Sequence, residues 1–474
     1  MTKSYLLHVL YGFALPLFMI SCGIRYDVAQ EVEWSDGSDV NISDGEITVS
    51  SGTKLLSADS YTDFTLTGQA FTEPDASASI WFHVGDNSGY EVLFQNGQMD
   101  GRQMTGSLVT VRNLYKSMAA DTTWFDFSIS VRSRNISVSV NGVDVVCYTE
   151  PDQPFRTEEN SGRRLSSGRF AIKGNKGMVK FRDIEVTPLR PGSVNPCDTM
   201  PPIDETTDKI IRLQQQNFPV IDYHVHLKGG LTKEMAHAMS MNYGINYGVA
   251  PNVGEGGVGR MLADDAEALE YFNEVSTHPF IMGAQGEGRR WIVQFSPEVL
   301  DQFDYMFTDA MTVVDRGRIS RIYRPEEVYW DGRSKQQYMD MIVDQTVKIL
   351  TNEPADIFAN ATYIPEDSMN DDYALYWTDE RVDKVLDVLE KYGIALEISP
   401  RYKIPSLDVI RKAKARGLKF TFGTNNVDAD FGRCEYAIQA IEECGLTPED
   451  IWFPSMGTRK GRKAVDYNHF GESK

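Results

Sequence analysis

Phe218-Pro-Val-Ile-Asp-Tyr-His-Val-His-Leu227 is the stretch that decides the fold of the longer, C-terminal part of this chain. Apolar residues open the stretch, and Asp222, His224 and His226 then follow at every second position. Because alternate side chains of a β-strand share one face, these three groups are predicted to point together from the end of a buried strand. Two imidazoles at this spacing, with an acid beside them, suit one metal ion. The alternative is a surface strand that carries two histidines.

The length and composition indicate a globular protein of two or three domains. A chain of 474 residues is too long for one ordinary domain, and its hydrophobic content of 41% is enough for a large core. The formal net charge of −21 argues against nucleic acid as a partner, because neutralising phosphates requires a basic face. A surplus of negative charge otherwise favours solubility.

The N-terminus has the pattern of an export signal. A lysine at position 3 precedes an apolar segment, 6–20, that is too short for a membrane-spanning helix. It ends in Met19-Ile20-Ser21-Cys22-Gly23, which resembles the box of bacterial lipoproteins. The resemblance makes 1–22 a lipoprotein signal region, with cleavage before Cys22 and lipidation of its thiol. We therefore expect a lipid-anchored protein of the bacterial cell envelope, facing the periplasm or the cell surface. The alternative is a plain secretory signal.

Four further cysteines are present, and an exported protein can oxidise them: Cys147, Cys197, Cys434 and Cys444. Cys434 and Cys444 fall on one predicted helix, where ten residues at 1.5 Å each place them about 15 Å apart. That separation is too great for a disulfide between the two.

Residues 31–189 have the periodicity of two that is typical of half-buried strands. The segment 125–140 alternates apolar and polar residues through a polar turn, which predicts an antiparallel hairpin. Three further segments have the same alternation: 79–84, 90–94 and 178–186. Many short strands separated by Gly, Asn and Asp predict an all-β jelly-roll sandwich.

The closing segments of this domain carry a family resemblance. Gly168-Arg-Phe-Ala-Ile-Lys-Gly174 and the following 179–189 resemble the concanavalin-like jelly roll called DUF1080, or 3-keto-disaccharide hydrolase domain. The resemblance implies a carbohydrate as substrate. Aromatic side chains at Trp81, Tyr90 and Trp124 are candidates for stacking on sugar rings, and packing in the core is the alternative for each.

After a proline-rich linker, 190–209, the sequence pattern changes to predicted strands, loops and helices in alternation. Predicted helices lie at 232–241, 260–275, 335–350, 379–392, 406–416 and 433–444, with apolar strand-like runs between them. This alternation is typical of a parallel α/β barrel, so 210–474 is predicted to form a TIM-like barrel.

Polar side chains stand where the predicted barrel strands end. In chain order they are His224 with His226, Asn252, Gln285 with Glu287, Asp309, Asn360 with Thr362, Glu397 and Asn425, with a possible eighth strand near Phe453. In α/β barrels the C-terminal ends of the strands hold the active site, and stability alone does not require polar groups to converge there. This convergence predicts a functional site at the barrel mouth.

Roles follow from residue type. His224, His226, Glu287 and Asp309 are the candidate ligands of one divalent metal, with zinc preferred and manganese or iron as alternatives. Such an ion can lower the pKa of a bound water towards neutrality. Glu397 or Asp222 is the candidate general base, or else orients a histidine.

The remaining candidates are expected to contact the substrate: Asn252, Glu255, Asn360, Arg401 and Asn425. Glu255 lies in a glycine-rich loop, 252–259, but the loop is acidic and lacks the Gly-Lys-Ser/Thr of a phosphate cradle. An arginine-rich insertion at 314–335 is either a lid over the barrel mouth or a solvated surface segment.

The barrel region also resembles the PHP (polymerase and histidinol phosphatase) family and, more distantly, amidohydrolases. The matching pieces are Asp222-Tyr-His-Val-His226, Gly286-Glu287, Ala395-Leu-Glu-Ile-Ser-Pro400, the run 413–425 and Gly445-Leu-Thr-Pro-Glu-Asp450. The resemblance implies a distorted barrel, up to three metals and phosphoester hydrolysis. The chain departs from the pattern at Asn425-Asn-Val427, where the family has Asp-x-His, around Asn252, and at Asp309, where a histidine is usual. These departures favour one metal, or none, over three.

Together these observations predict an envelope-anchored, metal-dependent carbohydrate-active enzyme. It is expected to cleave a glycoside or a 3-keto-glycoside by hydrolysis or elimination. The alternatives are a PHP-type phosphoesterase and a non-catalytic glycan-binding lipoprotein.

Overall fold

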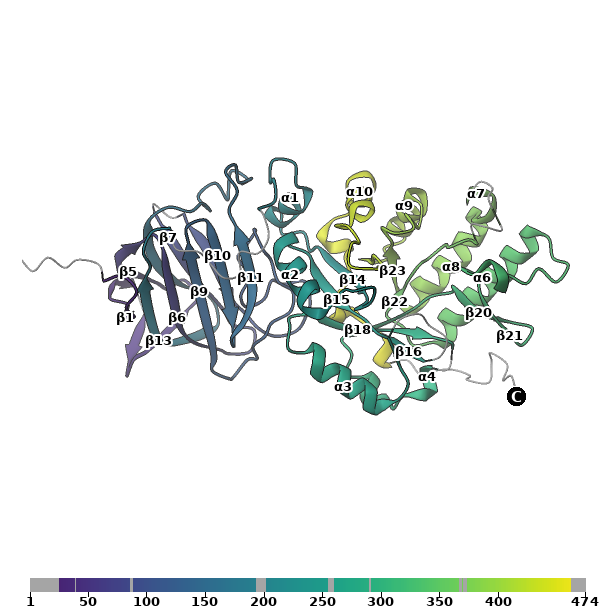
Figure 1. Ribbon diagram of the computed structural model, residues 1–474, viewed down its shortest axis with the longest axis horizontal. Coiled ribbons are helices and arrows are strands. Elements are labelled where there is room, and N and C mark those ends of the chain that lie inside the picture. Colours follow the sequence, from purple (N-terminus) through teal and green to yellow (C-terminus); the bar gives the residue numbers. More distant parts are fainter. Residues whose placement is uncertain are drawn as a thin grey trace, which may run out of the picture.

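A computed structural model describes residues 25–38, 40–85, 88–192, 202–254, 260–289, 291–365, 369 and 373–461. These residues form an N-terminal β-sandwich and a C-terminal α/β barrel, which lie next to each other along the long axis of the molecule (Figure 1). Two of the predicted site residues, Cys22 and Glu255, lie outside the described residues.

The sandwich consists of two antiparallel sheets, which confirms the predicted all-β domain. One sheet has the order β11-β10-β9-β6-β13-β4-β3 with β1 paired to β13, and the other has the order β2-β5-β12-β7-β8. The strands are β1 Gln30–Glu31, β2 Trp34–Ser38, β3 Asn41–Ser43, β4 Glu46–Ser50, β5 Lys54–Tyr61, β6 Phe64–Thr72, β7 Ser77–Val84, β8 Tyr90–Phe94, β9 Phe125–Arg132, β10 Asn135–Val140, β11 Val143–Thr149, β12 Gly168–Lys176 and β13 Met178–Pro188. The hairpin predicted at 125–140 is β9 paired with β10.

Alternation of side chains along the strands builds the sandwich core. Phe127 of β9 is buried, whereas its neighbour Asp126 is exposed, as expected for a strand with one face in the core and one face in solvent. Across the core, the Phe94 ring meets the rings of Phe127 and Phe181 edge to face, at centroid distances of 5.0 and 5.2 Å. Aromatic contacts of this kind join the two sheets.

Seven parallel strands close into a barrel, with the order β15-β14-β24-β23-β22-β19-β18 and a further β15–β18 pairing. They are β14 Ile221–Val225, β15 Asn246–Val249, β18 Ile281–Glu287, β19 Tyr305–Thr308, β22 Ile357–Phe358, β23 Ala395–Ile398 and β24 Phe420–Phe422. Two short strands, β16 Asn252–Gly254 and β17 Met261–Leu262, extend the sheet beyond β18. The eighth strand predicted near Phe453 is wrong, since only a single parallel bridge joins Phe420 and Ile451 there.

Helices cover the outside of the barrel (Figure 1). They are α1 Lys209–Gln215, α2 Lys233–Tyr243, α3 Asp265–Val275, α4 Trp291–Gln294, α5 Pro297–Leu300, α6 Lys335–Asn352, α7 Tyr373–Tyr376, α8 Asp379–Tyr392, α9 Leu407–Ala415 and α10 Glu435–Cys444, with 3₁₀ turns η1 Pro325–Glu327, η2 Pro448–Asp450, η3 Pro454–Met456 and η4 Arg459–Gly461. All six predicted helices are present within a few residues of their expected bounds. Within the described ranges, no helix is both long enough and apolar enough to cross a membrane.

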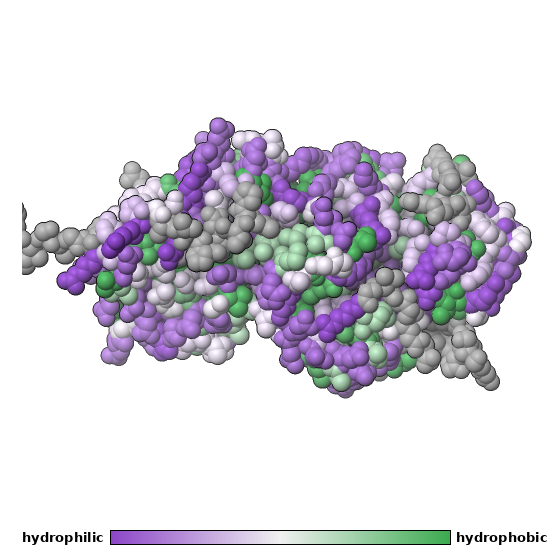
Figure 2. Space-filling view, in the orientation of Figure 1, coloured by the Kyte–Doolittle hydropathy of each residue, from purple (hydrophilic) through white to green (hydrophobic). Residues whose placement is uncertain are grey.

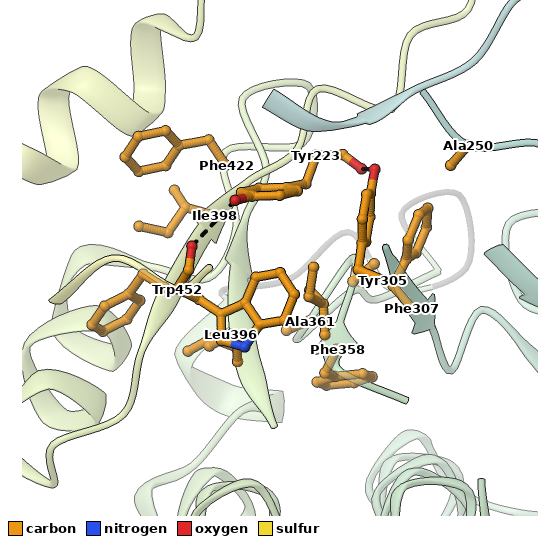
Figure 3. Packing of buried hydrophobic residues seen from close by; sticks show 14 of the residues in the cluster. Tyr223, Ala250, Tyr305, Phe307, Phe358, Ala361, Leu396, Ile398, Phe422 and Trp452 are labelled. Atoms are coloured by element: carbon orange, nitrogen blue, oxygen red, sulfur yellow. Dashed lines mark hydrogen bonds between the residues drawn. The ribbon is translucent and has the colours of Figure 1, made fainter. Parts of the chain in front are cut away.

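Aromatic side chains fill the barrel interior, so the barrel is packed and not a pore (Figure 3). Tyr305 donates its hydroxyl to the carbonyl of Tyr223 at 2.5 Å, and Tyr223 donates to the carbonyl of Trp452 at 3.3 Å. Gly248 and Gly283 leave the space that Tyr305 occupies, because a Cβ at either position would lie 2.4 Å or less from its ring or hydroxyl. The polar strand ends therefore stand above a closed apolar floor.

The sandwich packs against the N-terminal ends of the barrel strands. Arg112 donates to the carbonyls of Met241 and Asn242 at the end of α2, at 3.0 and 2.9 Å. The backbone N–H of Tyr115 donates to Asn246, the first residue of β15, at 3.1 Å. The C-terminal ends of the strands, which form the barrel mouth, consequently face away from this interface.

Candidate functional site

His224, at the end of β14, is oriented by the carboxylate of Glu397, which lies far away in the sequence. Its Nδ1 lies 2.7 Å from Oε2 of Glu397, and both side chains are almost fully buried. The other carboxylate oxygen of Glu397 accepts the backbone N–H of Asn360 at 3.0 Å. Among the described residues, no hydrogen-bond partner reaches the buried Nε2 of His224. With Nδ1 donating to Glu397, that free nitrogen carries a lone pair that suits either a metal ion or a proton.

His226 lies beside His224 in a similar arrangement. The two rings are 5.0 Å apart, and Nδ1 of His226 lies 2.6 Å from the carbonyl oxygen of Ala250. Burial, reinforced by the neighbouring His224, lowers the pKa of His226 well below its usual value. His226 is therefore neutral at pH 7, with Nε2 as the ring nitrogen that carries the lone pair.

A pair of acids lies at the neighbouring strand ends β18 and β19. The side-chain amide of Gln285 donates to Glu287 at 3.2 Å and to Asp309 at 3.1 Å. Burial, together with the negative charge of Asp309, raises the pKa of Glu287 to about 8. The Asn360 amide also donates to Asp309, at 3.1 Å.

Asparagines join these two groups into one network. The Asn425 amide donates to Asn360 at 3.2 Å, and the Asn425 backbone N–H donates to the carbonyl of His224 at 2.9 Å. Asn360 and Asn425 have φ angles of 48° and 51°, a left-handed conformation that asparagine tolerates better than most residues. The network thus runs from His224 through Glu397 and Asn360 to the acid pair, across the ends of six strands.

Asp222 contacts the backbone of His224 and the neighbouring Thr424, and not the side chains of this network, although the alternation predicted that the three groups would point together. One oxygen accepts the N–H groups of His224 and Thr424 at 3.1 and 3.0 Å, and the other accepts the Thr424 hydroxyl. A register shift between positions 222 and 225 interrupts the pairing of β14 with β15. These contacts tie β14 to the loop after β24, so they favour a structural role for Asp222 over the predicted role as a base.

The predicted substrate contacts are distributed around the mouth. Asn252 is buried in β16 and stands opposite Gln285 in the strand register. Arg401 is exposed, donates to the carbonyl of Asn425 at 3.0 Å, and lies 4.7 Å from the centre of the Tyr402 ring. Arg401 thus borders the network through its bond to the Asn425 backbone.

Two further residues belong to the mouth: Lys228, which sequence reasoning missed, and Tyr323, which lies in the insertion predicted to be a lid or a solvated segment. Lys228 follows the histidine motif, and burial together with the positive charge of Arg401 lowers its pKa to about 8. Burial and the charges of Glu287 and Asp309 raise the pKa of Tyr323 to about 12. In the sequence, the position of Lys228 two residues after His226 was the signal that could have placed it at the mouth. The position of Tyr323 depends on how the insertion folds, so no local sequence pattern places its side chain beside the acid pair.

The insertion that was predicted to be a lid or a solvated segment contains a hairpin of β20 Thr312–Asp315 and β21 Arg318–Arg321. Its arginines are paired with acids of the same segment: Arg316 and Arg318 with Asp331, Arg321 and Arg324 with Glu327, and Arg333 with Asp315. The insertion is thus held together by its own ion pairs, and Tyr323 is the residue that approaches the acid pair.

The residues of the mouth fit a metal ion in their chemistry but not in their arrangement. Two imidazoles that are each oriented through Nδ1 are typical zinc donors, and Nε2 of His224 has no partner among the described residues. However, no group of three or more His, Cys, Asp or Glu side chains within the described ranges is arranged to hold an ion. The predicted carboxylate ligands Glu287 and Asp309 are instead bonded to Gln285.

In the sandwich, the three aromatic candidates for sugar stacking differ in their surroundings. Tyr90 is fully buried and donates its hydroxyl to Glu150, so it cannot contact a sugar. Trp81 is half-buried, with the Lys173 ammonium 3.6 Å from its ring centre. Trp124 is also half-buried and lines a cleft at the domain interface.

Comparison with known proteins bears on the sandwich. Residues 27–187 match the family of 3-keto-alpha-glucoside-1,2-lyase-like domains. This match covers the two-sheet domain and agrees with the resemblance on its closing strands. No curated protein matches the chain.

Solved structures match over about a third of the chain, at low identity. A protein of Parabacteroides distasonis described as a glycosyl hydrolase is 13% identical, over 34% of this chain and 88% of its own, with a TM-score of 0.30. A carbohydrate binding module of Bacillus subtilis is 12% identical, over 35% and 99%, with a TM-score of 0.25. A beta-glucanase of Bacillus licheniformis is 10% identical, over 32% and 82%, with a TM-score of 0.22. At these scores the structures carry no argument about activity.

Proposed function

We propose that this protein is a carbohydrate-active enzyme that cleaves a glycoside or 3-keto-glycoside at the barrel mouth. The observation that carries the proposal is the buried, unpartnered Nε2 of His224 above a carboxylate that fixes its ring. A buried polar atom left without a partner is costly, so its retention favours a functional role. The lyase-like match of residues 27–187 supports a carbohydrate as substrate.

The geometry suits removal of a proton beside a ketone. In an elimination, Nε2 of His224 takes the acidified proton next to the 3-keto group, and Glu397 stabilises the imidazolium that forms. The electrons of the C–H bond form the new double bond as the glycosidic C–O bond breaks. The leaving oxygen then takes a proton from water or from the acid pair. In a hydrolysis, His224 instead removes a proton from the attacking water.

Metal dependence and membrane anchoring belong to the same proposal. In the metal-dependent form of this proposal, a divalent ion, zinc before manganese or iron, would be held by His224 and His226 and would supply Lewis acidity for the ketone. A carboxylate of the mouth, in place of His224, would then take the proton. Elemental analysis of the purified protein is expected to find close to one metal per chain, lost in the His224→Ala/His226→Ala variant.

Lipidation at Cys22 would anchor the chain in the cell envelope. The disulfide of Cys147 supports an oxidising compartment. Cys434 and Cys444 are free thiols, so they do not bridge each other, as their spacing predicted.

The deciding experiment measures turnover of 3-keto-trehalose, trehalose and a generic aryl phosphate by wild type, His224→Ala and the control His278→Ala. Turnover of the keto-sugar that falls at least 100-fold in His224→Ala and is retained in His278→Ala supports the proposal. Turnover of the aryl phosphate alone would replace it with a phosphoesterase. Binding of glycans without any turnover would replace it with a glycan-binding protein.

A further inference from the structure

A cleft of about 500 Å³ lies between the sandwich and the barrel, far from the barrel mouth. One wall is the sandwich segment that connects β8 to β9 and contains Lys116 and Trp124, and the other is the segment 276–282 between α3 and β18. In the space-filling view, the surface is notched where the two domains meet (Figure 2). The volume is within the range of small-molecule sites, which often form at domain interfaces.

The walls of the cleft are fixed in place by bonds across the interface. Lys116 forms an ion pair with Asp304 of the barrel at 3.0 Å, and Asp304 also accepts the backbone N–H of Met282 at 2.8 Å. Asn141 donates to the carbonyl of Met118 at 2.9 Å and accepts the N–H of Asp126 at 3.1 Å, which anchors the sandwich wall. A rigid cleft loses little conformational entropy when a ligand binds.

Trp124 provides an apolar platform of defined orientation. The Arg182 guanidinium lies 4.1 Å from the centre of its ring, and the Phe71 ring lies 5.6 Å away. On the other wall, His278 stacks on Phe280 at 5.7 Å, and its Nδ1 is 2.9 Å from the Thr277 hydroxyl. The cleft therefore combines aromatic surface with imidazole, amide and hydroxyl groups.

The charges of the cleft favour a neutral ligand. Lys116 is neutralised by Asp304, and the chain as a whole has a net charge of −21, which repels anions. A ligand with one apolar face and several hydroxyl groups matches Trp124 and its polar neighbours, as a sugar ring does.

We propose that this cleft is a second, non-catalytic binding site for a neutral oligosaccharide. Strand β18 separates it from the mouth: Met282 lines the cleft and Glu287 lies in the mouth network, about 17 Å apart at the usual rise of a strand. A glycan held in the cleft leaves the mouth free for another part of the same molecule or for a second one. The second site rests on the proposed function only in taking a carbohydrate as the ligand, and it does not depend on the reaction at the mouth.

The test is saturation-transfer difference NMR of maltotetraose and cellotetraose with wild type, Trp124→Ala and the mouth variant His224→Ala/His226→Ala. We expect one of these probes to bind and Trp124→Ala to weaken binding at least tenfold. The matched control Trp81→Ala, on the other sheet, is expected to bind as wild type does. Ala120→Trp fills the cleft from an exposed position and should block binding even if Trp124→Ala does not fold.

Three results would overturn the proposal: no binding of either tetrasaccharide, equal losses in Trp124→Ala and Trp81→Ala, or loss only in His224→Ala/His226→Ala. The last result would place the glycan at the mouth. Because the mouth variants and the cleft variants are measured separately, failure of this proposal does not imply failure of the proposed enzyme.

Discussion

At the scale of single residues, Gly423 determines where the carboxylate that orients His224 can stand. A Cβ at position 423 would lie 2.1 Å from Oε2 of Glu397, so any larger residue must displace that carboxylate. Glu397 reaches His224 and Asn360 with one oxygen each, and a displacement breaks one or both bonds.

We therefore expect Gly423→Ala to reduce kcat/KM at least tenfold and to cost about 1–3 kcal/mol in free energy of unfolding, the usual cost of overpacking a core. Kinetics and urea unfolding measure the two effects. The control Gly85→Ala has only an ordinary contact at 3.9 Å and should behave as wild type. Full activity of Gly423→Ala would show that the position of Glu397 does not matter.

Asp222 is expected to contribute to stability and not to chemistry. Removing its carboxylate in Asp222→Ala leaves the buried N–H groups of His224 and Thr424 without an acceptor. Each such group costs about 1–3 kcal/mol. Chemical denaturation is expected to show this loss, while the folded fraction retains kcat within a few-fold of wild type. A large loss of kcat without loss of stability would instead identify Asp222 as a base.

At the scale of elements, the hairpin β20–β21 is stabilised by its own charges. Arg333 binds Asp315 through both guanidinium branches, at 2.7 and 2.9 Å, and both side chains are largely buried. A two-branched pair of this kind fixes geometry as well as adding energy.

Arg333→Met is therefore expected to loosen the insertion locally. Hydrogen exchange of the backbone amides at 312–334 should accelerate at least tenfold, while the melting temperature of the whole protein changes by only a few degrees. Lys384→Met, which removes an exposed pair with Glu380 on α8, is the control and should change neither. Unaltered exchange in Arg333→Met would show that other contacts hold the hairpin.

At the scale of the whole molecule, the two domains meet at a histidine pair. His237 of α2 lies 2.6 Å from the carbonyl of Asp144 in β11, and its ring is 4.9 Å from that of His278. Burial is the main cause that lowers the pKa of His237 to about 4. Lys233 and Glu234 are the charged groups that act on His278.

The sign of the pH effect follows from that shift. Between pH 6.5 and 4 the unfolded chain binds a proton at position 237 that the folded chain excludes, so stability falls as the pH falls through this window. The full effect is about 3 kcal/mol, reached near pH 4, and it vanishes above pH 7. Thermal unfolding of wild type and His237→Gln from pH 7.5 to 4.5 measures it. Parallel pH profiles for the two proteins would contradict the assignment.

The sequence by itself determined the local structure. The alternation in 125–140 determines a hairpin, and the apolar runs that end in polar residues determine the barrel strands, because periodicity records which face is buried. It also placed His224, Glu287, Asp309, Asn360, Glu397 and Asn425 at strand ends.

Only the tertiary structure decided which of these residues touch. The bond between His224 and Glu397 joins positions 173 apart, and no local pattern encodes such a contact. Barrel closure after seven strands and the bonds of Asp222 to Thr424 depend on packing against distant segments. The same holds for the docking of the sandwich on the closed end of the barrel, which leaves the mouth open and creates the cleft at Trp124. Periodicity is a property of neighbouring residues, whereas a site is assembled by contacts between segments that the chain brings together only when it folds.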